Sequence, residues 1–225
     1  MKIHAITVCV DYTEFLAQSI ERWMQADSLT VITSLTDTDT HNLCAKNAGI
    51  TEYRTKAFYE YGAHFNKGAA IANCVRELCV SNWGPKDWVL FFDADIIPPV
   101  NWKERVEMCD PQFGHIYGAW RMDEKGNRIA DTYPAGYFLL FHSQDPNAKH
   151  DPIVDDCWMH AGNYDTTFIS RWQRHQLHWL PSIMVSHVGT PGLNWCGRGN
   201  TKAMNDVVAE RRKRRDWRHE TINKK

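Results

Sequence analysis

Apolar residues in the first half of the chain form short continuous runs that alternate with stretches of helical spacing. The runs expected to form strands occupy residues 3–10, 29–35 and 88–92. Apolar positions recur at helical spacing over residues 11–24, 40–47 and 67–82. The first of these helices is expected to begin with a capping box, because Asp11 and Glu14 have the required spacing. This alternation predicts an α/β fold whose mostly parallel sheet is flanked by helices.

The second half of the chain is less regular, and its pattern predicts shorter elements. Strands are expected over residues 115–120, 136–141, 177–180 and 183–187, with a turn over residues 124–127. A helix is expected over residues 165–174. A Gly-rich loop over residues 189–200 precedes a last helix, which begins near Ala203 and leads into the basic run of residues 211–215.

The composition limits the classes of protein to consider. Hydrophobic residues make up 43% and charged residues 24% of 225 residues, with a formal net charge of -1, which excludes a disordered chain and a general polyanion binder. There is no apolar stretch of about 20 residues and no signal-peptide pattern, so we expect a cytoplasmic protein. Seven cysteines without a CxxC pair indicate neither a disulfide framework nor a zinc ribbon. Ten tryptophans supply aromatic faces of the kind that hold sugar rings or bases.

Two carboxylates stand two residues apart at the end of the apolar run 88–92. Asp93 and Asp95 are followed by Ile96-Ile97-Pro98-Pro99, so both charges lie between apolar segments and need a partner. Paired carboxylate oxygens at the carboxyl end of a buried strand suit Mg²⁺ or Mn²⁺, which would bridge to a diphosphate. The alternative is a polar turn after a strand. We favour the metal site because of its apolar surroundings.

The phrase Phe91-Phe92-Asp93-Ala94-Asp95 resembles the donor metal site of the GT-A glycosyltransferases, in particular of family 2-like enzymes. Asn66-Lys67-Gly68 is similar to the element that opens the helix before the metal strand in that family, which implies that Asn66, Lys67 and Asp93 contact a nucleotide-sugar donor. The resemblance implies a GT-A, Rossmann-like fold. We expect one compact domain with a nucleotide-sugar-binding half, an acceptor and catalytic half, and a C-terminal helix with a basic tail, over residues 1–120, 121–200 and 201–225.

The segment Ala161-Gly162-Asn163-Tyr164-Asp165, continuing to Phe168 and Arg171, resembles a motif of the β-1,4-galactosyltransferase group. In that group an Asp at the position of Asp165 is the base that deprotonates the acceptor hydroxyl. Tyr164 and Thr166 replace acidic residues of the motif here, and Asp155 and Asp156 are close enough in sequence to be the base instead. A single Asp at a helix start can also be only an N-cap.

Further candidate residues follow other predicted strands. The resemblance implies that His187 is a third metal ligand, and imidazole suits Mn²⁺ better than Mg²⁺. Asp11 and Asp37 follow the first two strands, at the edge where α/β folds bind nucleotides, although each could instead cap a helix or form a turn. Arg121 could contact the diphosphate or be a solvated charge. The loop 189–200 is expected to be a mobile lid over the donor.

Together these features predict a metal-dependent, inverting glycosyltransferase that moves a sugar from a nucleotide-sugar donor to a hydroxyl acceptor. The basic run 211–215 has the charge density for phosphate contacts, so one acceptor to consider is a hydroxymethylated base in viral DNA, modified by a virus-encoded enzyme in the host cytoplasm. A solubilising helix end would explain the same run. The alternatives are a nucleotidyltransferase, although no Gly-rich phosphate loop follows the first strand, and a nucleic-acid-binding protein without catalysis.

Overall fold

A mixed β-sheet forms the centre of the protein, and the first half of the chain supplies the strands of its parallel half. The computed structural model describes residues 1–189. The parallel strands lie in the order β3-β2-β1-β4 and have these bounds: β1 Ile3–Val8, β2 Ser28–Ser34, β3 Ile50–Thr55 and β4 Trp88–Asp93. Because these strands are parallel, their carboxyl ends lie along one edge of the sheet, which is where ligands bind in α/β folds.

The rest of the sheet comes from the second half of the chain. It continues from β4 in the order β8-β6-β9-β5, with β7 paired to β6. The bounds are β5 Ile96–Ile97, β6 Ile116–Met122, β7 Arg128–Ile129, β8 Phe138–His142 and β9 Leu177–His187. Strand β8 runs antiparallel to β4 and β6, whereas β6 and β9 are parallel. The insertion of β8 places the segment before it beside the carboxyl end of β4.

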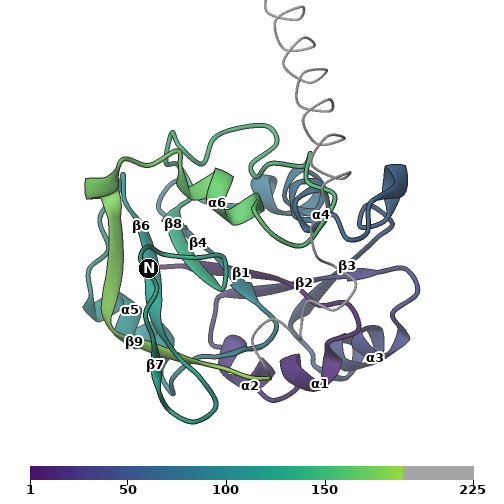
Figure 1. Ribbon diagram of the computed structural model, residues 1–225, viewed down its shortest axis with the longest axis horizontal. Coiled ribbons are helices and arrows are strands. Elements are labelled where there is room, and N and C mark those ends of the chain that lie inside the picture. The colour runs from purple at the N-terminus through teal and green to yellow at the C-terminus, as the bar shows by residue number, and fades with distance from the viewer. Residues whose placement is uncertain (190–225) are drawn as a thin grey trace, which may run out of the picture.

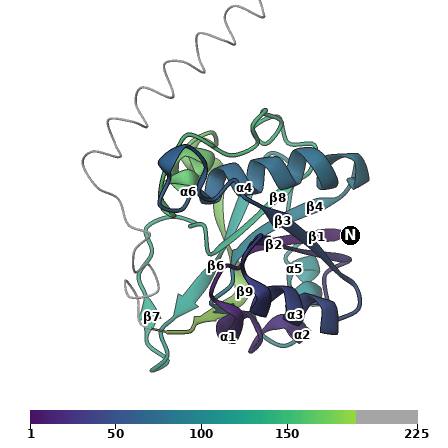
Figure 2. The ribbon, with the colours of Figure 1, turned by 90° about the vertical axis from the view of Figure 1, so that its right-hand side faces the viewer.

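Helices cover both faces of the sheet (Figures 1 and 2). One face carries α4 (Lys67–Cys74) and α6 (Tyr164–Ile169), and the other carries α1 (Thr13–Leu16), α2 (Ile20–Trp23), α3 (Thr38–Lys46) and α5 (Trp102–Met108). Strand β4 shows why the core has two halves. Its residues Val89 and Phe91 pack under α4 and α6, while Leu90 and Phe92 pack against the opposite helices. This confirms an α/β fold with a mostly parallel sheet flanked by helices.

Several expected elements have different bounds in the structure. The helix expected over residues 11–24 is two short helices, α1 and α2, separated where Ser19 Oγ donates to the carbonyl of Leu16. The capping box is wrong, because Asp11 has a left-handed backbone with φ 54° and the N-cap of α1 is Tyr12, whose side chain does not cap the helix. Helix α6 ends at Ile169 rather than at residue 174, and the two late strands are one strand, β9, which contains an irregularity in its pairing with β6.

The helix expected over residues 67–82 continues beyond α4 as a π-helical turn and a short 3₁₀ turn, Val75–Cys79 and Val80–Asn82. Two other 3₁₀ turns are Glu60–Gly62 and Arg174–Gln176. Within residues 1–189, no helix is long and apolar enough to cross a membrane. The division expected near residue 120 falls inside β6 and stays a prediction.

Candidate functional site

A polar cleft lies at the carboxyl ends of β1 and β4. Its lining includes the three carboxylates Asp93, Asp95 and Asp165, together with Lys67 and Tyr164. The carboxylates come from segments far apart in sequence, since Asp93 ends β4, Asp95 follows it, and Asp165 lies in the first turn of α6. The structure therefore brings four of the expected site residues, Lys67, Asp93, Asp95 and Asp165, to one cleft.

Asp93 is held by Lys67, the first residue of α4. Lys67 donates a hydrogen bond to Asp93 Oδ1, and its ammonium lies 4.9 Å from the centre of the Tyr164 ring. Burial opposes the charged form of Lys67, but its interactions with Asp93 and Tyr164 together outweigh it, so the pKa of Lys67 is raised. Burial raises the pKa of Asp93, the charges of Asp95 and Asp165 add to that effect, and Lys67 opposes it. One partly buried lysine thus faces three neighbouring carboxylates.

The phenol of Tyr164 is part of the same cluster. Tyr164 is 3% exposed, which shows that the residue replacing an acidic position of the galactosyltransferase motif is packed into the core. Burial raises the pKa of the Tyr164 phenol, and the charges of Asp93 and Asp165 raise it further, whereas Lys67 lowers it. The phenol therefore stays protonated at neutral pH and adds no negative charge to the cleft.

Asp95 pairs with His187, the last residue of β9. His187 Nε2 lies 3.1 Å from Asp95 Oδ2, and both side chains are buried. The backbone holds the two segments together, because Ile96 of β5 pairs with His187 and the Val188 amide donates to the Asp95 carbonyl at 2.8 Å. The proximity of Asp95 and His187 follows from this pairing of β5 with β9, two strands that lie far apart in the sequence.

Arg121 lies behind His187 and is held by an acidic partner. Its Nη1 is 3.4 Å from His187 Nδ1, and its Nη2 donates to Asp131 Oδ1 at 2.7 Å. The Tyr137 hydroxyl donates to Asp131 Oδ2 at 2.9 Å, and the Tyr137 ring lies 4.5 Å from the Arg121 guanidinium carbon. Arg121 is therefore neutralised by Asp131 in this arrangement rather than being a solvated charge.

Asp165 is anchored by two backbone amides. The Gly136 amide donates to Asp165 Oδ2 at 2.9 Å, and the Thr166 amide donates to Asp165 Oδ1 at 2.9 Å. The N-cap of α6 is Asn163 rather than Asp165. The interpretation of Asp165 as an N-cap is therefore wrong, and its carboxylate reaches across to the segment before β8.

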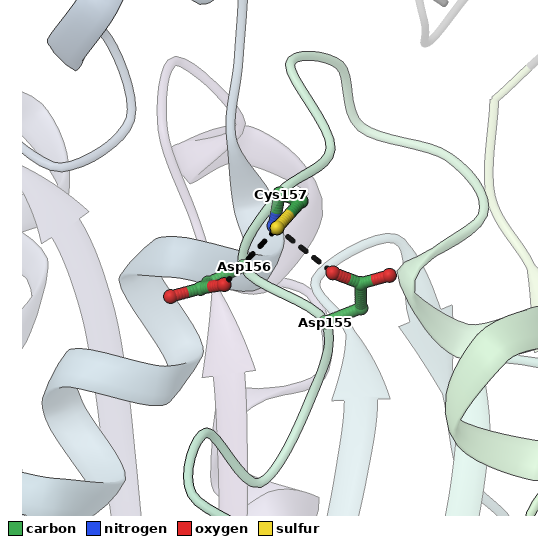
Figure 3. Close-up of side chains that lie close together, drawn as sticks. All are labelled: Asp155, Asp156 and Cys157. Carbon is green, nitrogen blue, oxygen red and sulfur yellow. Dashed lines mark hydrogen bonds between the residues drawn. The ribbon is translucent and has the colours of Figure 1, made fainter. Parts of the chain in front are cut away.

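The alternative bases Asp155 and Asp156 lie in the loop that packs on the start of α4. Figure 3 shows their carboxylates and the Cys157 thiol side by side. One ligand atom of each lies within 4.8 Å of those of the other two. The Cys157 amide donates to Asp155 Oδ1 at 3.0 Å, and the Cys157 thiol is 3.6 Å from Asp156 Oδ1. Neither carboxylate is part of the lining of the cleft that holds Asp165.

Asn66 and Asp37 have structural partners. Asn66 is the N-cap of α4; its side-chain oxygen accepts from the Ala69 amide at 2.8 Å, and its nitrogen donates to the Asp156 carbonyl. Asp37 is the N-cap of α3 and also accepts from the Asp11 amide at 2.8 Å. Burial raises the pKa of Asp37, but these hydrogen bonds outweigh it and lower the pKa overall. Asp11 and Asp37 thus fix each other beside the sheet edge, and their donor contacts stay predictions.

Three expectations concern segments that lie mainly or wholly outside the described residues. These are the lid over residues 189–200, of which only Gly189 is described, the last helix beginning near Ala203 in the part 201–225, and the basic run 211–215.

Comparison of the sequence with protein-family models and with curated proteins gives no match. Among solved structures, TarS 1–349 of S. aureus in complex with UDP-GlcNAc superposes with a TM-score of 0.63 at 8% identity, over 92% of this chain and 64% of that chain. The fold is GT-A-like. Glucosyl-3-phosphoglycerate synthase of M. tuberculosis superposes with a TM-score of 0.51 at 13% identity, over 92% of this chain and 77% of that one.

A mycobacterial protein is similar at a TM-score of 0.53 and 16% identity, over 86% of this chain and 69% of that chain. Identities this low establish the GT-A-like fold and nothing further. The chain spans 64% of the TarS structure, so the shared part is less than two thirds of that protein. The resemblance of residues 161–171 to the β-1,4-galactosyltransferase group stays a prediction.

Sequence reasoning missed three residues that shape this site. Asp131 pairs with Arg121, Gly136 anchors Asp165, and Tyr137 accepts the Asp93 amide at its carbonyl, 3.3 Å away. Gly136 had a signal, because it lies in the strand expected over residues 136–141, and a glycine in a strand indicates a close approach of another segment. A Cβ on Gly136 would lie 2.7 Å from Asp165 Oδ2. Asp131 has no signal of its own, since it stands in a polar loop.

Proposed function

We propose that the protein transfers a sugar from a nucleotide-sugar donor to a hydroxyl acceptor, with a divalent cation at Asp93 and Asp95. The observation that carries this proposal is the excess of carboxylates at the carboxyl edge of the sheet. Asp93, Asp95 and Asp165 share one cleft with a single lysine, Lys67. An excess of negative charge in a partly buried site favours the binding of a cation.

The donor atoms are of the types that such a cation takes, but those of Asp93, Asp95 and His187 do not all lie within 4.8 Å of one another, so the side chains would have to turn to share one ion. Asp93 and Asp95 offer carboxylate oxygens, and His187 Nε2 lies beside Asp95 Oδ2. A mixed oxygen and imidazole set suits Mn²⁺, and the carboxylates alone suit Mg²⁺. When bound, the cation would offset the negative charge that develops on the departing nucleoside diphosphate. Binding through Nε2 would put the ring proton of His187 on Nδ1, and Arg121 Nη1 is itself a donor, so this contact would give way when the cation binds.

The remaining residues have separate tasks in the proposed reaction. Asp165 accepts the proton of the acceptor hydroxyl as the acceptor oxygen bonds to the anomeric carbon and the bond to the diphosphate breaks. This direct displacement inverts the configuration at that carbon. The Gly136 and Thr166 amides hold the Asp165 carboxylate in place for that step. Lys67, at the start of α4, supplies a positive charge next to Asp93 and would contact the diphosphate.

Nucleotidyl transfer is the alternative with the same donor chemistry, and its products differ. A glycosyltransferase releases a nucleoside diphosphate, whereas a nucleotidyltransferase consumes a nucleoside triphosphate and releases pyrophosphate. The connection after β1, Cys9-Val10-Asp11-Tyr12, contains no glycine, so it lacks the Gly-rich phosphate loop that such enzymes usually carry. Formation of pyrophosphate from nucleoside triphosphates and sugar phosphates would identify that activity.

The decisive experiment measures cleavage of nucleotide sugars in the presence of Mn²⁺. The product measured is UDP for UDP-sugars, GDP for GDP-sugars and CMP for CMP-sugars. We expect one donor to be cleaved by the native protein and cleavage to be lost in Asp95→Asn, which removes one charge without changing the shape of the side chain. The matched control is Asp39→Asn, because Asp39 is an exposed carboxylate on α3. Full cleavage by Asp95→Asn at saturating Mn²⁺ would contradict the proposal that Asp95 binds the cation.

A further inference from the structure

We call the cleft that holds Asp93, Asp95 and Asp165 the donor cleft. A second cavity lies on the far side of Asp165 from it. Its volume is about 540 Å³, within the range of small-molecule sites. It is lined by the rings of Tyr133, Trp172 and Trp179 and by the apolar side chains of Pro134 and Ile169. We name this cavity the aromatic groove.

The aromatic groove and the donor cleft share a wall. Pro134 and Thr166 line the groove, whereas Gly136 and Asp165 line the cleft. These residues belong to the same two segments, which are joined by the hydrogen bond from the Gly136 amide to Asp165. A molecule in the groove would therefore have one end beside the carboxylate proposed to be the base.

One side of the groove is formed by the end of an aromatic stack. The Trp120 and Trp179 rings stack with centres 4.4 Å apart and an interplanar angle of 13°. The Arg128 guanidinium carbon lies 3.7 Å from the centre of the Trp120 ring. Trp179 is the member of this stack that lines the groove. Packing against Trp120 holds the Trp179 indole in one orientation, so it can offer a fixed ring face to a ligand.

The polar groups of the groove are mostly hydroxyls. Thr132, Thr166 and Ser170 are exposed members of its lining, and the Tyr133 side chain adds a phenol. Arg174 is the one charged residue among the lining residues that the structure describes. Aromatic faces next to neutral hydroxyls match sugar rings, which have apolar C–H faces and hydroxyl edges. One arginine is too few to neutralise the successive phosphates of a nucleic acid.

We propose that the aromatic groove binds the acceptor and that this acceptor is a saccharide. Its ring would lie against Trp179 and Tyr133, and its reacting hydroxyl would point to Asp165. The assignment of the bound saccharide as the acceptor rests on the proposed function, whereas binding of saccharide to the groove does not depend on it. The two can therefore be tested separately.

The test measures binding of chitotriose, cellotriose and maltotriose to the full chain by isothermal titration calorimetry. At least one of them binds the native protein, and Tyr133→Ala and Trp179→Leu each weaken that binding about tenfold, because each removes a ring face. Tyr133 is 45% exposed, so its substitution leaves the fold intact even if Trp179→Leu does not. The control is Trp83→Leu, which removes a tryptophan from a different cavity and leaves saccharide binding unchanged.

Three results would overturn the proposal: none of the saccharides binds, Tyr133→Ala binds as tightly as the native protein, or the groove variants weaken duplex DNA binding instead. The same variants are assayed for cleavage of the nucleotide sugar. Suppose that donor cleavage depends on Asp95 but that saccharide binding is unchanged in the Tyr133 and Trp179 variants. This result would contradict the saccharide site in the groove and support the proposed function. Suppose instead that saccharide binding depends on Tyr133 but that the native protein cleaves no donor. This result would contradict the proposed function and support the binding site.

Discussion

Lys67 and the proposed cation compete for the same carboxylate. Lys67 bonds to Asp93 in the structure, and the two charges stabilise each other in a buried place. A cation that binds to Asp93 must displace this ammonium, and a donor diphosphate would offer the ammonium a new partner. Binding of the cation is therefore expected to be weak without donor and stronger with it.

Replacement of Lys67 by methionine should separate these two effects. In Lys67→Met the Asp93 carboxylate loses its internal partner, so Mn²⁺ binds more tightly in the absence of donor, while cleavage of the donor falls because a positive charge near the diphosphate is lost. Isothermal titration with Mn²⁺ and a cleavage assay measure the two quantities. Lys103→Met is the control, because Lys103 pairs with Asp27 at 2.6 Å outside the cleft. A weaker affinity for Mn²⁺ in Lys67→Met would contradict the competition.

Substitution of Asp165 tests the base. Asparagine can still accept a hydrogen bond from the Gly136 amide through its carbonyl oxygen, so the fold is retained while the ability to accept a proton is lost. Sugar transfer should fall by about 10²- to 10⁴-fold in Asp165→Asn, the usual contribution of a positioned base, with donor affinity unchanged. If Asp156→Asn shows this loss and Asp165→Asn does not, the base is in the loop beside α4.

The site residues differ in how far the sequence could place them. Asp93 could be placed because it directly follows a continuous apolar strand, and such strands end at the ligand-binding edge of a parallel sheet. The contact between Asp95 and His187 depends on the pairing of β5 with β9, which no local pattern discloses. The pairing of Arg121 with Asp131 depends on the path of the loop after β6, and loop paths leave no periodic signal.

At the scale of elements, strands buried on both faces were predictable and partly exposed elements were not. Strand β4 is a continuous apolar run and lies in the structure where the sequence places it. Strand β3 is half-exposed at the edge of the sheet, so its residues Ile50–Thr55 include charged ones and carry no strand pattern. Helix α5 was missed because it has only seven residues and two buried ones, Trp102 and Val106, which is too short a repeat to stand out as a helical pattern.

Helix α4 explains why glycine follows Lys67. A Cβ on Gly68 would lie 2.1 Å from the Asp155 carbonyl oxygen, so the loop 155–157 packs directly on the helix backbone. Gly68→Ala should lower the free energy of unfolding by about 1–3 kcal/mol, as overpacking of a close contact does. Urea denaturation measures it, and Ser is expected to be worse than Ala at this position. An unchanged midpoint would show that the loop moves aside without cost.

At the scale of the whole molecule, the donor should stabilise the folded state. A nucleotide sugar that binds only the native protein at about 100 times its dissociation constant adds about 2.7 kcal/mol. For a chain of this size that corresponds to a rise in Tm of about 5–10 °C. A thermal-shift screen with UDP-, GDP- and CMP-sugars in the presence and absence of Mn²⁺ would detect it. The rise is expected to need Mn²⁺ and to disappear in Asp95→Asn.

The short segment before β8 contacts both the proposed base, Asp165, and the proposed metal ligand Asp93. The Gly136 amide binds the Asp165 carboxylate, and the carbonyl of the next residue, Tyr137, binds the Asp93 backbone amide. Peptide groups this close along one chain cannot move far apart, so a bend of the sheet or a shift of α6 moves residues Asp93 and Asp165 together. In a lineage of such proteins, insertions in the exposed turn over residues 124–127 would leave this spacing untouched. An insertion between Pro134 and Phe138 would change it, and selection would remove that insertion even where the fold survives.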